Sequence, residues 1–315
     1  MIGYLVRRLL QAVLVVLGVI LIMFLLIHVI PGGEARAVEG PRATLAQLRL
    51  FNKQNGLNLP LWDQFFRYIW NLSRFRLGDA PTYNLPVLTL IANRLPKTLI
   101  LVGLSTLVAL VVAIPLGVLQ VVRRNKPIDY ALTGVSFVMY AIPTFLLGTL
   151  LILWFAADLK VFPGEAPQGQ SVLAILGDPR ALVLPVLTLA AVTIASFSRY
   201  MRSSMMETMT EDYVRTARAK GAAPRRVMYV HALRNAIIPI VTLIGLSIGS
   251  IVSGAVITET VFNFPGMGKL AIDAAYRLDI PVLLGTTFVA TVATVGGNLL
   301  SDILYAVVDP RIRYA

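Results

Sequence analysis

Long apolar runs without charged side chains alternate with short polar segments along the whole chain. Six runs of 18 or more residues contain no Asp, Glu, Lys or Arg, and they cover residues 9–33, 98–122, 131–157, 181–198, 235–258 and 280–301. An α-helix needs about 20 apolar residues to cross the roughly 30 Å hydrocarbon core of a bilayer. The pattern therefore predicts an all-α, polytopic membrane protein with six transmembrane helices.

Composition excludes several other classes of protein. The chain is 57% hydrophobic and 14% charged, whereas soluble domains are about 45–50% apolar and about 25% charged. With no cysteine, disulfides, thiolate nucleophiles and Cys-ligated metal centres are excluded. The two histidines form no H-E-x-x-H motif, which excludes a zinc metalloprotease of that type.

In a soluble protein, a net charge of +12 would suggest a nucleic-acid partner. In a membrane protein, the distribution of Lys and Arg among the loops predicts which side of the membrane each loop occupies. If the N-terminus lies inside, the inner segments hold 15 of the 28 basic residues, and the two short outer segments hold two each. The outer segment 31–97 holds nine, but long loops translocate regardless of charge. We therefore expect both termini in the cytoplasm and no nucleic-acid partner.

The spans divide the chain into three parts. Residues 1–30 form the N-terminus and first span, 31–97 a long external segment, and 98–315 a five-helix core whose cytoplasmic loop covers 199–235. The first run is preceded by basic residues and followed by an A-x-A sequence at 35–37, as in a signal peptide. Its 22 apolar residues exceed the 7–15 of a signal peptide, so we expect a retained span.

The external segment contains an amphipathic stretch. Trp62, Phe65, Phe66, Ile69 and Trp70 recur at the spacing of one helix face, and Pro60 is suited to the helix start. One interpretation is a helix lying on the membrane surface or packed on the spans. The alternative is a docking surface for an external partner, formed by Trp62, Phe65, Phe66 and Trp70.

The inner loop carries strong signals for a short helix. Residues 204–207 fit a capping box, Thr210 can cap the next helix, and Glu211 and Asp212 suit its first turn. Gly221 is placed as the left-handed residue after the helix ends. So short a helix is marginal alone, which suggests docking into a groove of a partner. A solvated basic loop is the alternative.

Two other features occur within the spans. Gly245, Gly249 and Ser253 recur every four residues in the fifth span, which is typical of close helix packing, either internal or between subunits. Asn298 and Asp302 lie one turn apart in the last span, where we expect a solvated or structurally paired carboxylate rather than a proton relay. A self-sufficient secondary transporter would need more charges at mid-membrane, and a membrane-embedded enzyme would need a catalytic constellation.

The motifs closely resemble a known family over nearly the whole chain. The chain is similar to the permease subunits of binding-protein-dependent ABC importers for dipeptides, oligopeptides and nickel, and its long first external segment matches the B-type subunit. The residues that carry the resemblance are Arg7 to Leu10, Ile142 to Phe145, Glu211 to Gly221, His231 to Ala236, Glu259 to Phe262, Phe264 to Gly266 and Asp309 to Arg313.

The resemblance implies the type I ABC importer permease fold and a site of energy coupling. The inner loop then corresponds to the coupling segment, whose short helix sits in a groove of a cytoplasmic ATPase. Gly221 matches the motif's glycine, but Arg215, Thr216 and Ala217 stand where the motif has Glu-Ala-Ala. The expected coupling residues are Glu211, Asp212, Tyr213, Arg215, Thr216, Ala217, Arg218, Ala219, Lys220 and Gly221.

The resemblance also implies partners. The chain has no P-loop, since residues 266–270 lack its spacing and its Ser/Thr. ATP and Mg would therefore be bound by two partner ATPase subunits, and this chain would be a non-catalytic subunit without a cofactor or metal. The other expected partners are a second homologous permease in a heterodimer, an external binding protein and membrane lipid, in a bacterial inner membrane. The expected cargo is dipeptides or oligopeptides, with nickel or glutathione as alternatives.

Overall fold

Long helices that follow the apolar runs build almost the whole structure. The computed structural model describes residues 2–29, 33–40, 42–244 and 255–308. Within them, five helices are long and apolar enough to cross a membrane, or six if one bent pair counts as a single span. The five are α1 (Ile2–Val29), α5 (Val87–Val122), α9 (Pro179–Thr208), the helical stretch Pro224–Ile244 and α16 (Ile280–Val308). The all-α prediction is confirmed.

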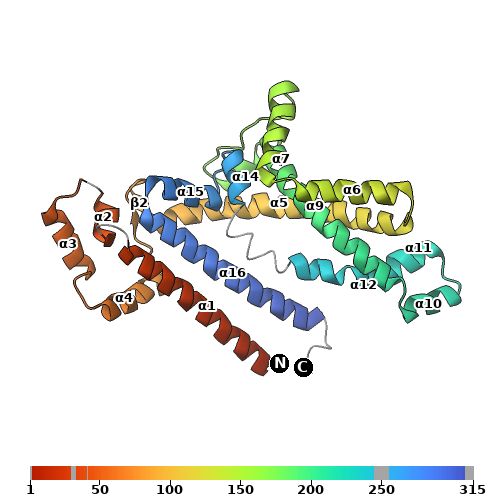
Figure 1. Cartoon of the computed structure of the whole chain (residues 1–315), viewed down its shortest axis with the longest axis horizontal. Coiled ribbons are helices and arrows are strands. Elements are labelled where there is room, and N and C mark those ends of the chain that lie inside the picture. Colours follow the sequence, from red (N-terminus) through yellow and green to blue (C-terminus); the bar gives the residue numbers. More distant parts are fainter. Residues whose placement is uncertain (1, 30–32, 41, 245–254, 309–315) are drawn as a thin grey trace.

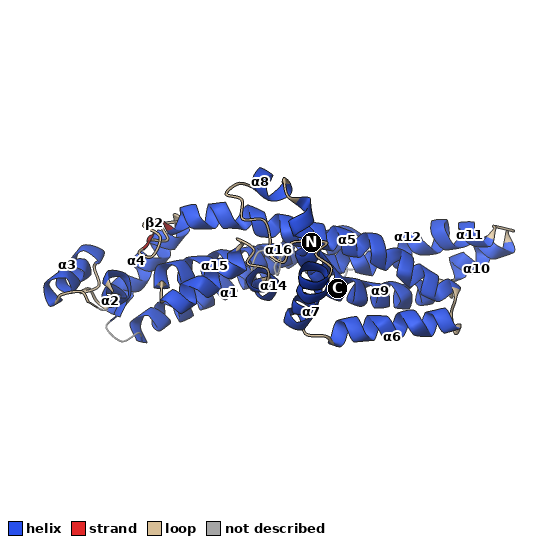
Figure 2. Cartoon of the chain, turned by 90° about the horizontal axis from the view of Figure 1, so that it is seen from above, coloured by secondary structure: helices blue, strands red, loops and turns tan. Residues whose placement is uncertain are grey.

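The molecule is elongated, with different short helices at its two ends (Figures 1 and 2). One end, called the α3 end, carries α2 (Gly33–Glu39), α3 (Leu45–Asn55) and α4 (Leu61–Ser73). The opposite end, called the α10 end, carries α10 (Asp212–Ala219) and α11 (Pro224–Arg226). The helix α5 (Val87–Val122) runs along the long axis between the two ends and is continuous over 36 residues.

The start of α5 differs from the sequence prediction. The helix begins at Val87, eleven positions before the predicted span at 98, and continues through Pro96. The charges of Arg94 and Lys97 interrupt the apolar run here, and a proline is usually unfavourable inside a helix. The structure accommodates the buried Lys97 because its Nζ donates a 2.9 Å hydrogen bond to the backbone oxygen of Gly169. Lys97 therefore lies inside the helix and makes a local contact, and it does not mark the start of the helix.

The third predicted span, 131–157, is not straight. It consists of α6 (Pro127–Ala141) and α7 (Thr144–Leu151), which continues as the π-helix η1 (Ile152–Asp158), and the two parts are bent by 103°. Pro143 causes the break, since the residue before a proline is disfavoured in the helical region and Ile142 is extended. As Figure 1 shows, α7 projects sideways from the long axis.

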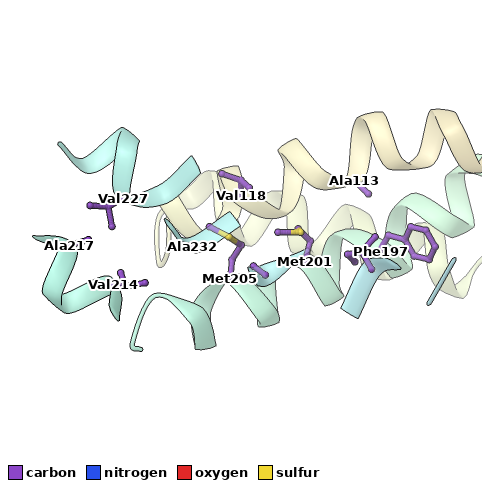
Figure 3. Close-up of a cluster of buried hydrophobic side chains, with 11 residues drawn as sticks. Ala113, Val118, Phe197, Met201, Met205, Val214, Ala217, Val227 and Ala232 are labelled. Carbon is purple, nitrogen blue, oxygen red and sulfur yellow. The ribbon is translucent and has the colours of Figure 1, made fainter. Parts of the chain in front are cut away.

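Near the α10 end, α5 and α9 cross closely. A Cβ added to Gly117 of α5 would lie 2.6 Å from the Met201 Cβ of α9, so only glycine permits this approach. Figure 3 shows Met201 and Met205 between the helices, next to Ala113 and Val118. This buried cluster joins the two long helices to α10 and to the helical stretch Pro224–Ile244.

Toward the α3 end, α1 and α16 run antiparallel and side by side (Figure 1). Helices α14 (Val256–Val261) and α15 (Met267–Arg277) connect to α16, while α8 (Val172–Leu176) precedes α9. A two-residue antiparallel pair, β1 (Asp79–Ala80) with β2 (Leu85–Pro86), leads into α5. This small hairpin is an addition to the all-α expectation.

The fifth span is described only in part. The helical stretch begins at Pro224, eleven residues before the predicted start of the span at 235, and passes through the π-helix η2 (Val227–Ala232) and α12 (Leu233–Ala236) to Ile244. Gly245, Gly249 and Ser253 lie outside the described residues. Their role in packing or in a subunit interface stays a prediction.

Candidate functional site at the α10 end

The short helix α10 is held on the molecule by two apolar side chains. Val214 is fully buried and Ala217 is 9% exposed, and both belong to the buried cluster that includes Met205 and Val227. Figure 3 shows Val214 and Ala217 pointing toward Val227. The helix therefore does not need independent stability, because α9 and η2 provide its packing surface.

The helix α10 starts one residue later than the sequence predicts, because the residue at its N-cap is Glu211 and not Thr210. Glu211, with extended backbone, is the residue before the first turn, and its carbonyl oxygen accepts from the amides of Val214 and Arg215. Thr210 does not cap α10; its hydroxyl donates 2.7 Å to the carbonyl oxygen of Glu207. The capping box predicted at 204–207 is also wrong, because those residues continue α9. Packing of Met205 in the cluster outweighs the local capping signal.

The end of α10 agrees with the prediction. Gly221 has a φ of +78°, and its amide donates 2.9 Å to the carbonyl oxygen of Arg218. The next amide, of Ala222, donates 3.1 Å to the carbonyl oxygen of Ala217. No heavy atom lies within 4 Å of a Cβ added at Gly221, so backbone conformation alone favours glycine here.

The outward face of α10 is polar and basic. Nine of the ten predicted coupling residues are exposed, and Ala217 alone faces inward. Asp212 and Arg215 form a 3.4 Å ion pair on the surface, and the Arg218 guanidinium lies 3.8 Å from the Met209 Sδ. The exposed residues are Glu211, Asp212, Tyr213, Arg215, Thr216, Arg218, Ala219, Lys220 and Gly221. The arrangement suits contact with a partner surface rather than chemistry.

Two important residues near this site were missed from the sequence. Asp129 at the start of α6 is 2% exposed, and both its oxygens accept 3.0 Å hydrogen bonds from the Arg202 guanidinium of α9. The amide of Asn125 donates a third hydrogen bond to Asp129. Both residues lie at the inner boundaries of predicted spans, but nothing in the sequence pairs positions 73 residues apart.

A second buried carboxylate lies far from α10. Glu259 of α14 is fully buried, and it accepts 2.8 Å from the Thr98 hydroxyl and 2.9 Å from the amide of Lys269. The amide of Gly268 donates to it as well. Burial raises the pKa of Glu259 above its ordinary value, although the hydrogen bonds from Lys269, Thr98 and Gly268 oppose this shift. The carboxyl thus joins α5, α14 and the first turn of α15.

The proposed external docking face is divided by the structure. Phe65 of α4 packs against Phe24 of α1, with ring centroids 5.2 Å apart. Trp62, Phe66 and Trp70 point away and are exposed. The four residues therefore do not form one surface, since the same helix uses one side for packing.

Among the residues that the structure describes, no three His, Asp or Glu side chains come together in a way that could hold an ion.

Family models match nearly all of the chain. Residues 109–314 match the model described as a binding-protein-dependent transport system inner membrane component. Residues 1–102 match the model of the N-terminal part of such membrane components. Thr98 lies within the N-terminal match, and Asp129, Arg202, α10 and Glu259 lie within the other.

Full-length relatives are similar along the whole sequence. The chain is 39% identical over 316 residues to the oligopeptide transport system permease protein AppB of Bacillus subtilis, with all of both chains covered. It is 34% identical to the dipeptide transport system permease protein DppB of Escherichia coli K12, covering 100% of this chain and 99% of that one. It is 36% identical to the glutathione transport system permease protein GsiC of Salmonella paratyphi A, with both fully covered.

Proposed function

Because the chain belongs to the family of binding-protein-dependent transport system inner membrane components, we propose that it imports dipeptides or oligopeptides as the permease subunit of an ATP-driven transporter. The observation that carries this proposal is the full-length similarity to oligopeptide and dipeptide permeases at 34–39% identity. Glutathione, itself a small peptide, is the cargo named for another full-length relative and is the alternative cargo. Nickel, which the family resemblance implies, is the second alternative cargo.

Uptake measured in a reconstituted system tests the cargo. The chain would be purified with a second permease and two ATPase subunits, placed in proteoliposomes, and supplied with an external binding protein. We expect ATP-dependent uptake of labelled dipeptides or oligopeptides. Uptake of glutathione or nickel alone would contradict the peptide assignment, and uptake by this chain without ATPases would indicate a secondary transporter.

We propose that α10 docks on a cytoplasmic ATPase subunit, which binds ATP and Mg in place of this chain. The support is its exposed polar face on a helix fixed from behind by Val214. The basic residues concentrate in the segments that share its side of the membrane, which favours both termini in the cytoplasm and residues 31–97 outside. A second, homologous permease would complete the translocation pathway.

In this mechanism the permease moves rather than catalyses. Closure of the ATPases would shift α10, and Val214 would pass the shift to Met205 of α9 within the shared cluster. The hydrogen bonds from Arg202 to Asp129 would carry the movement of α9 to α6. The pathway between the two permeases would thereby open alternately to the outside and the inside.

Gly221→Pro is expected to uncouple transport. Proline fixes φ near −65°, whereas Gly221 has a φ of +78°, and proline also lacks the amide that donates to Arg218. The end of α10 must therefore reorganise, and we expect at least a tenfold loss of uptake, corresponding to about 1.4 kcal/mol or more. The variant should still insert into the membrane. Gly221→Asn is the matched control, because asparagine tolerates the left-handed region; equal uptake in both variants would contradict the prediction.

Arg218→Glu is expected to weaken assembly with the ATPases. Arg218 is exposed, and the change reverses its charge on the proposed docking face without altering the buried residues of α10. We expect less ATPase subunit to copurify with the permease, most clearly at low salt, because exposed charge interactions are screened by salt. Arg36→Glu, an exposed charge reversal on α2 at the other end, should have no effect. Unchanged copurification in Arg218→Glu would argue against this face.

A further inference from the structure

Arg199 lies inside a helix that is long and apolar enough to cross a membrane. It belongs to α9, and its position is about 14 Å along the helix from the end at Thr208. A charged residue inside a membrane helix is costly, and such residues almost always face the protein interior or a water-filled cavity. The surface of α9 that carries Arg199 is therefore a candidate wall of the translocation pathway.

The guanidinium of Arg199 points away from the α10 end. The helices α6 and α9 lie side by side (Figure 2), and the Ser136 and Ser198 hydroxyls, 3.5 Å apart, mark positions at the same level. Tyr140 lies one helical turn beyond Ser136, farther from the ion pair of Asp129 at the start of α6. The Arg199 Cζ lies 4.4 Å from the centre of the Tyr140 ring, so the side chain reaches toward the middle of the span. An arginine near a membrane surface ordinarily extends its charge to the headgroups instead.

The charge of Arg199 meets two aromatic rings and no acid. Its Cζ lies 5.5 Å from the centre of the Phe137 ring, in addition to the contact with Tyr140. Within the described part of the chain Arg199 forms no ion pair, and its buried Nε has no hydrogen-bond partner. Asp129, the one acid of α6, already accepts from Arg202 with both oxygens. Aromatic faces attract a cation but leave the N–H donors of the guanidinium available to an anion.

The rings leave the guanidinium accessible from one side. Phe137 is 56% and Tyr140 53% exposed, and Arg199 itself is only partly buried. A guanidinium offers paired N–H donors that match the two oxygens of a carboxylate. Every peptide with a free C-terminus carries such a carboxylate, whatever its side chains are. A nickel ion, by contrast, would be repelled by the same charge.

We propose that Arg199, flanked by Phe137 and Tyr140, binds the C-terminal carboxylate of a peptide as the peptide crosses the membrane. The proposal rests on the proposed import of dipeptides or oligopeptides. The ligand is a peptide carboxylate rather than a phospholipid phosphate, because the guanidinium is directed into the span and away from the α10 end. Recognition of a group that peptides share would allow one pathway to accept peptides with different side chains.

Binding of a dipeptide and of its C-terminal amide tests the site directly. Alanylalanine and alanylalanine amide would be titrated separately, in saturation-transfer NMR, against the whole complex in nanodiscs without the external binding protein. The amide keeps the size and the amino group but lacks the carboxylate, so we expect its dissociation constant to be about tenfold higher. Equal affinity for the two peptides would overturn the proposal, even in a complex that imports peptides.

Arg199→Gln and Arg199→Lys test the role of the guanidinium. Arg199→Gln should abolish the preference for the free acid, whereas Arg199→Lys should keep part of it, because lysine keeps the charge but not the paired donors. With saturating, peptide-loaded binding protein, we expect Arg199→Gln to lower uptake per ATP hydrolysed about tenfold. Arg123→Gln, at an exposed arginine directly after α5, is the matched control and should change neither measurement.

Two further results would overturn the proposal. One is a lower unfolding temperature in both Arg199 variants together with an undiminished preference for the free acid, which would assign Arg199 a structural role. The other is loss of a copurified anionic phospholipid from Arg199→Gln, detected by native mass spectrometry, with the acid preference unchanged; this would assign the site to lipid. Preferential binding of the free acid by a complex that imports no peptide would contradict the proposed cargo and still support the carboxylate site.

Discussion

Arg202→Ala is expected to lower the free energy of unfolding by about 3–5 kcal/mol and to abolish uptake. The change leaves Asp129 buried at 2% exposure, with the amide of Asn125 still donating to its carboxylate. An uncompensated buried carboxylate is costly, because little water can reach it. Since α6 would lose its link to α9, movement of the α10 end would no longer reach it. Thermal unfolding in detergent and uptake in proteoliposomes measure the two effects.

Removing the other partner of the pair allows the stabilities of the variants to be ranked. Asp129→Ala should cost less than Arg202→Ala, because the Arg202 side chain is 27% exposed and can still meet water. The double variant should be more stable than Arg202→Ala alone, since no buried charge then remains. Arg215→Ala is the matched control: its ion pair with Asp212 is exposed, and such pairs contribute about 0–1 kcal/mol. Similar unfolding temperatures for Arg202→Ala and Arg215→Ala would refute the role of the buried pair.

Glu259→Ala is expected to destabilise the packing of α15 by about 3 kcal/mol or more, because several donors lose one shared acceptor. The Thr98 hydroxyl and the amides of Gly268 and Lys269 all donate to this carboxyl. Thr98 also accepts from the amide of Met267, so the loss would extend to the first turn of α15. We expect a lower unfolding temperature and reduced uptake, both measurable on the purified complex.

Close packing around the carboxyl provides an independent test. A Cβ at Gly266 would overlap the Glu259 carboxyl, so Gly266→Ala should displace it and lower the unfolding temperature as well. Gly103→Ala is the control, because no atom lies within 4 Å of a Cβ there. Glu259→Gln should fall between wild type and Glu259→Ala, since it keeps one acceptor oxygen. Wild-type stability in Glu259→Ala would exclude an anchoring role.

Local signals predicted α10 well and the helix boundaries poorly. The helix through 213–220 and the left-handed Gly221 follow from short-range rules, and both are present. The cap at Thr210 failed because its hydroxyl prefers the Glu207 carbonyl at the end of α9. The amphipathic pattern of α4 predicts one apolar face, but Phe65 packs inward whereas Phe66 and Trp62 point outward.

The amino-acid sequence alone determined that the chain is a membrane protein, that it is all-α, and which family it belongs to. Apolar runs of membrane length and family motifs are local properties of the chain. Only the tertiary structure decided which polar groups are buried together. Asp129 with Arg202, and Thr98 with Glu259, lie 73 and 161 residues apart. Such pairs form because a desolvated charge needs a hydrogen-bond partner from whichever helix packs beside it. The positions of these residues along the chain do not predict which helix will pack beside them.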